Sequence, residues 1–174
     1  MTKRYPKQLS VGTNNIVVAL NNEEAAKIYE GDTRSDIGSE AEKMKFANRI
    51  NTLVVKFIRL DFDTTKNWEL LVMERLYPLD YRSLEMEKRE LIYSVFEDEL
   101  KQLHLSGFVH RDIRRPSNIS GDKYDNVFLT DKGIRLIDVG ISAIKPNVGD
   151  NLFGKYVENE LNELTQFKSY FLNR

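Results

Sequence analysis

The stretch His110-Arg111-Asp112-Ile113-Arg114-Arg115-Pro116-Ser117-Asn118-Ile119 directly follows a long predicted helix. A second stretch, Leu136-Ile137-Asp138-Val139-Gly140, comes after a predicted hairpin with the turn Thr130-Asp131-Lys132-Gly133. Either stretch alone is typical of a surface turn or of a helix-capping Asp. Together, they supply aspartates and an asparagine, which are side chains of the kind that phosphoryl transfer uses. That chemistry needs oxygen ligands for magnesium and a carboxylate that orients the attacking hydroxyl.

The segment before these stretches predicts a sheet with one helix. Two turn signals, Gly12-Thr13-Asn14-Asn15 and Asn21-Asn22, bracket the apolar run 16–20 and predict three short antiparallel strands up to residue 29. Residues 35–50 predict a helix, and residues 53–62 and 68–73 predict two further strands. The apolar residues that recur at helical spacing in 35–50 are Ile37, Ala41, Met44 and Ala47.

The segment from residue 74 onward predicts helices around one hairpin. Residues 74–80 contain Pro78 and form a connector, and residues 84–106 predict a helix that Gly107 ends. Residues 127–129 and 134–137 are the strands of the hairpin, and residues 152–172 predict a last helix capped by Asp150. The apolar stripe of the first helix is Ile92, Phe96, Leu100 and Leu103. The fold class expected from this order is α+β.

Composition excludes several classes of protein. The chain has 174 residues, 41% of them hydrophobic, so it can bury a core. Its formal net charge of −1 offers no basic field for nucleic acid, and without cysteine it has neither disulfides nor thiolate metal sites. No apolar run approaches the roughly 20 residues that span a bilayer, and no signal peptide is evident. We therefore expect no membrane partner and a cytoplasmic location.

The stretch around Asp112 resembles the catalytic loop of the protein kinase superfamily, and Asp138-Val139-Gly140 resembles its metal-binding Asp-Phe-Gly motif. The resemblance implies that Asp112 is the catalytic base and that Asp138 binds Mg²⁺ with ATP. It also implies a bilobal fold with an antiparallel-sheet N-lobe plus one helix over residues 1–73. A hinge over 74–80 and a truncated helical C-lobe over 81–174 would complete it.

The loop after Asp112 departs from the family pattern by one extra residue. Ile113 to Ser117 separate Asp112 from Asn118, which the loop match favours as the second metal ligand. Asn126 is the rival, because it stands directly before a predicted strand. By the same resemblance, Arg115 or its neighbour Arg114 replaces the loop lysine near the transferred phosphate, a position that suits the donor fork of a guanidinium.

Ala25-Ala26-Lys27-Ile28-Tyr29 resembles the strand that carries the phosphate-pairing lysine of kinases. The resemblance also implies a glutamate partner for Lys27 on the following helix. Glu40 and Glu42 are both candidates, since residues four apart share a helix face. Glu40 is preferred because its neighbours Ala41 and Met44 belong to the apolar stripe.

Two further segments resemble parts of the nucleotide-binding site in the family. Gly12 stands where kinases carry a glycine-rich loop, and backbone N–H groups there would cover the phosphates. Met73 would border the adenine pocket. Backbone groups from Glu74 to Leu76 would bond the adenine edge.

Only residues 141–174 follow the second motif, so the chain resembles reduced relatives such as the RIO kinases or the small kinase–ATPase subunit of the KEOPS complex. The function expected is that of a minimal serine/threonine protein kinase, a transferase that uses ATP and Mg²⁺. A small-molecule kinase or ATPase and a kinase-like regulatory module are the alternatives. A trimmed C-lobe exposes surface, so a protein partner or self-association is also expected.

Overall fold

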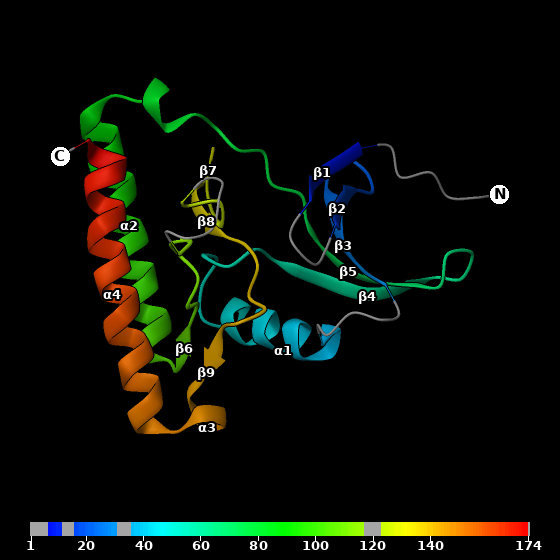
Figure 1. Cartoon of the computed structure of the whole chain (residues 1–174). Coiled ribbons are helices and arrows are strands. Elements are labelled where there is room, and N and C mark those ends of the chain that lie inside the picture. The colour runs from blue at the N-terminus through cyan, green and yellow to red at the C-terminus, as the bar shows by residue number, and fades with distance from the viewer. Residues whose placement is uncertain (1–6, 12–15, 31–35, 117–122, 174) are drawn as a thin grey trace.

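The sheet expected near the start of the chain is present, and it has five antiparallel strands (Figure 1). The computed structural model describes residues 7–11, 16–30, 36–116 and 123–173. The strand order is β1-β2-β3-β5-β4, with β4 at one edge. The strands are β1 (Lys7–Val11), β2 (Ile16–Ala19), β3 (Glu24–Glu30), β4 (Phe57–Asp63) and β5 (Trp68–Glu74).

The predicted helix over residues 35–50 is confirmed as α1 (Ile37–Asn48). Asp36 caps it, because its side chain accepts a hydrogen bond from the N–H of Ser39 at 3.0 Å. Three of the four predicted stripe residues are fully buried, and Ile37 is partly buried against the same core. Helix α1 covers the sheet face that carries Leu71 and Met73, whereas the opposite face has a smaller core of its own.

The strand predicted from residue 53 was wrong in its first part, because β4 begins only at Phe57. Leu53, Val54 and Val55 are buried, but they bond to the later hairpin instead of the sheet. Val55 N–H donates to Leu136 O and Leu136 N–H donates to Leu53 O, each at 2.8 Å. This short run is apolar because it lies in the core between the sheet and the rest of the chain.

A pair of long helices lies at one side of the molecule, away from the sheet (Figure 1). Helices α2 (Met86–Leu105) and α4 (Asp150–Leu172) lie side by side (Figure 1). Hairpin β7 (Val127–Thr130) and β8 (Gly133–Leu136) confirms the predicted one. Short elements complete this part: η1 (Tyr81–Ser83), β6 (Phe108–Val109), β9 (Ala143–Ile144) and α3 (Lys145–Val148). The cap of α4 is Gly149 at φ 83°, so the prediction of Asp150 as its cap was wrong by one residue.

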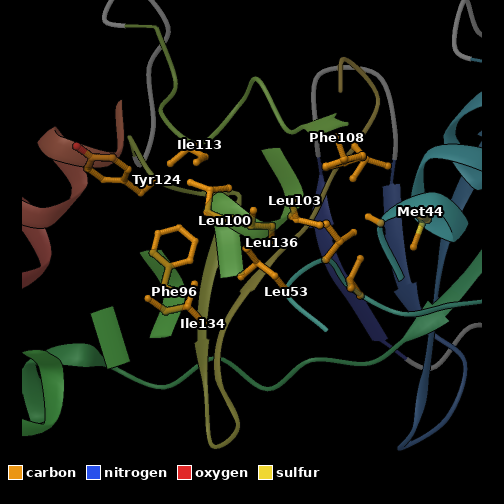
Figure 2. Packing of buried hydrophobic residues seen from close by; sticks show 14 of the residues in the cluster. Met44, Leu53, Phe96, Leu100, Leu103, Phe108, Ile113, Tyr124, Ile134 and Leu136 are labelled. Atoms are coloured by element: carbon orange, nitrogen blue, oxygen red, sulfur yellow. The ribbon is translucent and has the colours of Figure 1, made fainter. Parts of the chain in front are cut away.

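One hydrophobic core joins the sheet to the helix pair. Figure 2 shows Phe96, Leu100 and Leu103 of α2 gathered with Leu53 and Leu136. The same core extends to Met44 of α1 and to Phe167 of α4. Rings from α2 and α4 meet directly, since the centroids of Phe96 and Phe167 lie 5.4 Å apart in an edge-on arrangement. In the predicted stripe of α2, Ile92 is only partly buried and Tyr93 is buried beside it.

Candidate functional site

Lys27 lies at the centre of a cluster of charged side chains between β3 and α1. Its side chain is only 9% exposed, and its Nζ donates to Glu40 Oε1 at 3.0 Å and to Glu40 Oε2 at 3.2 Å. A buried ammonium is stable only when carboxylates offset the loss of hydration. Burial lowers the pKa of Lys27, but Asp138 and Glu40 more than compensate and raise it. Lys27 is therefore held charged in the interior.

Glu40, and not Glu42, is the residue that lies against Lys27. Tyr29, two residues along β3 and so on the same face, donates its hydroxyl to Glu40 Oε2. Glu42 is exposed and bonds Lys45 at 2.9 Å. Two side chains of β3, Lys27 and Tyr29, thus hold the carboxylate of Glu40 in place.

Asp138 brings the loop after β8 to the same lysine. Its Oδ1 lies 3.2 Å from Lys27 Nζ and accepts the N–H of Gly140 at 3.2 Å. Burial raises the pKa of Asp138, but Lys27 and the Gly140 amide hold it below its usual range. The side chain is still 47% exposed, so the ionised carboxylate also faces solvent.

Asp112 and Asn126 form a second polar pair beside the first. Asn126 Nδ2 donates to Asp112 Oδ2 at 2.9 Å and to the Asp112 carbonyl at 3.0 Å. The N–H of Asp112 donates to His110 Nδ1, so His110 carries its proton on Nε2 and donates it to the Ile137 carbonyl at 2.9 Å. Burial, together with the nearby charge of Asp138, raises the pKa of Asp112.

Strained backbone marks both motifs. Arg111 has φ 73° and Asp138 has φ 58°, in the left-handed region that L-residues rarely adopt. Arg111 is held there by contacts on both sides. Its guanidinium lies 3.7 Å from the ring centroid of Tyr156 and bonds the Ile141 carbonyl at 3.0 Å. Strain of this kind persists where the surroundings impose it, and it concentrates at functional sites.

Two glutamates of α4 anchor the loop that carries Asp112. Glu160 is buried, and it accepts the N–H groups of Arg111 at 2.6 Å and His110 at 3.3 Å. It also lies 2.6 Å from His104 Nε2 of α2. One turn on, Glu163 accepts the N–H of Arg114 at 3.3 Å, and burial raises the pKa of its carboxyl to about 7.

These two glutamates are not among the site residues that the sequence predicts. A signal for Glu160 was available, because it shares the helical spacing of the buried Phe153, Leu164, Phe167 and Phe171. An acid on the apolar face of a helix needs buried partners. The position of Glu160 in the sequence therefore predicts a buried, hydrogen-bonded carboxylate, but it does not identify the groups that bond it.

The other predicted site residues are placed as follows. The guanidinium of Arg115 bonds the carboxylate of Asp125, and its N–H donates to Lys123 O at 2.7 Å. Met73 is buried against the main core, next to Glu74, whose side chain accepts the N–H of Lys56 at 2.8 Å and also bonds Arg135. Leu76 packs on the same core. Gly12 and Asn118 lie outside the described residues.

A cavity of about 340 Å³ lies apart from Lys27, between the connector after β5, the β7–β8 hairpin and α4. Leu79, Tyr81, Phe128 and Tyr170 are among its lining residues. Lys27, Asp112 and Asp138 do not line it. The polar cluster and this cavity are therefore separate features.

No protein-family model matches the sequence. No curated protein matches it either. Within the described residues, no helix is long and apolar enough to cross a membrane. Across the same residues, no group of three or more His, Cys, Asp or Glu side chains could hold a metal ion.

Proposed function

We propose that this chain is an ATP-dependent phosphotransferase with a bilobal, protein-kinase-like fold, acting as a minimal serine/threonine protein kinase. One observation carries the proposal: Lys27 lies 3.0 Å from Glu40 on α1 and 3.2 Å from Asp138 after β8. These three residues come from distant parts of the chain, and they are the lysine, glutamate and aspartate that the resemblance requires. A buried, charged lysine beside a solvent-facing carboxylate suits a phosphate bound with a cation.

Asp112 is the base in this proposal. Its carboxylate accepts the proton of the substrate hydroxyl as that oxygen bonds the γ-phosphorus and the bond to the ADP oxygen breaks. Two features support the role. Burial raises the pKa of Asp112 toward a value at which a base can accept a proton, and Asn126 fixes the orientation of the carboxylate at 2.9 Å.

Asp138 and Asn126 fit a magnesium ion. Asp138 uses Oδ1 for both of its contacts, which leaves Oδ2 for a cation. Asn126 uses Nδ2 toward Asp112, so its amide oxygen is directed elsewhere. Magnesium is commonly held by one or two protein oxygens together with substrate phosphates, so a cage of three acids is not required. Bound with the nucleotide, magnesium would neutralise charge on the phosphates.

The contact with Asp112 favours Asn126 over Asn118 as the amide of this site. The sequence match favoured Asn118, which lies outside the described residues. Residues 113–125 then separate the two polar partners in the sequence, which makes this loop longer than in the family pattern. Arg115 bonds Asp125 and Arg114 bonds Tyr124, so both arginines stay candidates for the residue that meets the transferred phosphate.

The adenine would lie beside Met73, at the end of β5. The N–H of Glu74 donates to Lys56 O at 3.0 Å and that of Arg75 donates to Glu23 O at 2.8 Å. We therefore assign adenine recognition to the Glu74 carbonyl and to Leu76. The loop at Gly12 would cover the phosphates.

The test is incubation of the pure protein with magnesium and γ-labelled ATP. We expect label on the chain itself or on a generic protein substrate, and loss of label of at least about a hundredfold in Asp112→Ala and Asp138→Ala. Asn126→Ala should abolish metal-dependent labelling and Asn118→Ala should not. Full activity in both aspartate variants would contradict the site assignment.

Two other outcomes would replace the protein-kinase proposal. Release of free phosphate without labelled protein would indicate an ATPase or a small-molecule kinase. Nucleotide binding without any turnover would indicate a kinase-like regulatory module.

A further inference from the structure

Strand β4 leaves one side of the sheet open. It is the edge strand of the sheet, and among the described residues no strand pairs with its outer side. Three of its apolar side chains are exposed: Ile58 by 37%, Leu60 by 46% and Phe62 by 47%. An open edge with exposed apolar side chains is a template for pairing with another strand.

We propose that β4 pairs with β4 of a second copy of this chain, antiparallel and about a two-fold axis at Leu60. This pairing would extend the sheet across the dimer, and it is independent of the proposed function. The proposal is based on the sequence of β4, Phe57-Ile58-Arg59-Leu60-Asp61-Phe62-Asp63. This sequence is complementary to a second copy of itself that runs antiparallel to it.

In this register, Arg59 lies opposite Asp61 of the second copy, and the symmetry repeats the pair on the other side of the axis. Leu60 lies opposite Leu60, and Ile58 lies opposite Phe62. Opposite charges and apolar side chains across an antiparallel pair both stabilise it. Two ion pairs thus flank a central apolar contact.

The position of the charges supports the geometry. Arg59 and Asp61 are two residues apart in β4, so they share one face of the sheet, and their side chains lie 3.7 Å apart. Arg59 also bonds Glu24 at 2.8 and 3.0 Å, which holds the guanidinium in place on that face. Both side chains remain 44% exposed, so they can be reached by a second chain.

Other registers are less complementary. A shift by two residues in one direction places Arg59 opposite itself, and like charges across a pair are destabilising. A shift by two in the other direction places Asp61 opposite itself, and the Asp63 that would then face Arg59 is only 4% exposed. Parallel, in-register pairing places Arg59 opposite Arg59 and Asp61 opposite Asp61. A shift by one residue sets the charged face of one chain against the apolar face of the other. The register centred on Leu60 is therefore selected by charge.

The test is the mass of the full chain in solution, measured by sedimentation equilibrium over a range of concentrations. The wild-type chain should dimerise reversibly. Arg59→Asp and Asp61→Arg should each raise the dimer dissociation constant by roughly tenfold or more, because each sets like charges opposite one another twice. Mixed together, these two variants should form a one-to-one complex, since acidic residues on one chain then face basic residues on the other.

Two further variants test whether the change in self-association comes from the β4 edge. Glu24→Gln removes the partner of Arg59 within the chain and should leave the dimer intact. Leu60→Lys places two cations at the axis and should give a monomer, which provides a second test should a charge variant fail to fold by circular dichroism. The proposal is overturned by a wild-type chain that stays monomeric at every concentration. It is equally overturned by charge variants that dimerise as tightly as the wild-type chain, or by a mixture that forms no complex.

Discussion

Single residues in this chain are governed by the balance between burial and charge. Lys27 stays charged in the interior because Glu40 and Asp138 lie within hydrogen-bonding distance. Among the residues that the structure describes, none forms an ion pair with Glu163, and burial with the nearby carboxylates Glu160 and Asp112 raises its pKa to about 7. Its protonation state therefore changes near neutral pH, which gives a measurable signature.

Glu163 should make the folded state less stable as the pH rises. Between the ordinary glutamate pKa of 4.5 and about 7, the folded chain keeps a proton on Glu163 that the unfolded chain has released. The free energy of unfolding therefore falls through this window. Glu163→Gln removes the titration, so the variant should lose less stability than the wild-type chain between about pH 5 and 7.

The measurement is the difference in urea midpoint between wild type and variant at several pH values. Glu158→Gln, an exposed acid on the same helix, is the control and should leave the pH dependence unchanged. A constant difference for Glu163→Gln across this range would contradict the assigned titration.

Helix α4 makes two kinds of structural contact. Its apolar side packs on α2, and its buried Glu160 accepts the backbone N–H groups of His110 and Arg111. The strained φ of Arg111 lies in the middle of this contact. The helix therefore holds the loop of Asp112 in a conformation that the loop would not adopt alone.

Glu160→Gln should destabilise the protein and loosen that loop. The amide keeps one acceptor oxygen, but it loses the charge that strengthens three hydrogen bonds. We expect a loss of roughly 1–3 kcal/mol in the free energy of unfolding. Urea unfolding measures the loss, and hydrogen exchange should be faster at the amides of His110 and Arg111.

Glu158→Gln is again the matched control, and it should change neither quantity. Unchanged exchange at Arg111 in Glu160→Gln would mean that α4 does not hold the loop.

In the whole molecule, the sheet with α1 contacts the rest of the chain through both apolar and polar groups. Backbone hydrogen bonds join Leu53 and Val55, before β4, to Leu136 of β8. The polar contact that matters for the candidate site is Lys27 with Asp138. The polar contact faces solvent at Asp138, so a ligand could bind across the two parts of the chain. Binding at such a junction would stabilise the whole fold and not one element.

If the proposed function is correct, magnesium with ATP should stabilise the folded chain. At a ligand concentration about 100 times the dissociation constant, the free energy of unfolding should rise by about 2.7 kcal/mol. Asp138→Asn should reduce this increase strongly, because it removes the charge proposed to bind the cation. Asp131→Asn, an exposed carboxylate in the β7–β8 turn, should retain the full increase.

Thermal and urea unfolding with and without ligand measure the effect. An equal increase in the Asp138→Asn variant would place the nucleotide elsewhere. No increase in the wild-type chain would count against nucleotide binding.

Local patterns predicted most of the elements. Helical spacing marked α1 and α2, and a four-residue turn marked the β7–β8 hairpin. The errors came where an apolar run had no distinctive period. The apolar run 53–55 predicts a strand, because burial in a core between two parts of a chain gives the same sequence pattern as burial in a sheet.

The sequence by itself determined the α+β class, the order of the longer helices and strands, and the identity of Lys27, Asp112 and Asp138 as candidate site residues. Only the tertiary structure decided that Glu40 meets Lys27, that Asn126 meets Asp112 and that Glu160 anchors the loop. The reason is physical. Periodicity and turn chemistry act between near neighbours in the chain, whereas these contacts arise from burying charges between elements that are distant in sequence.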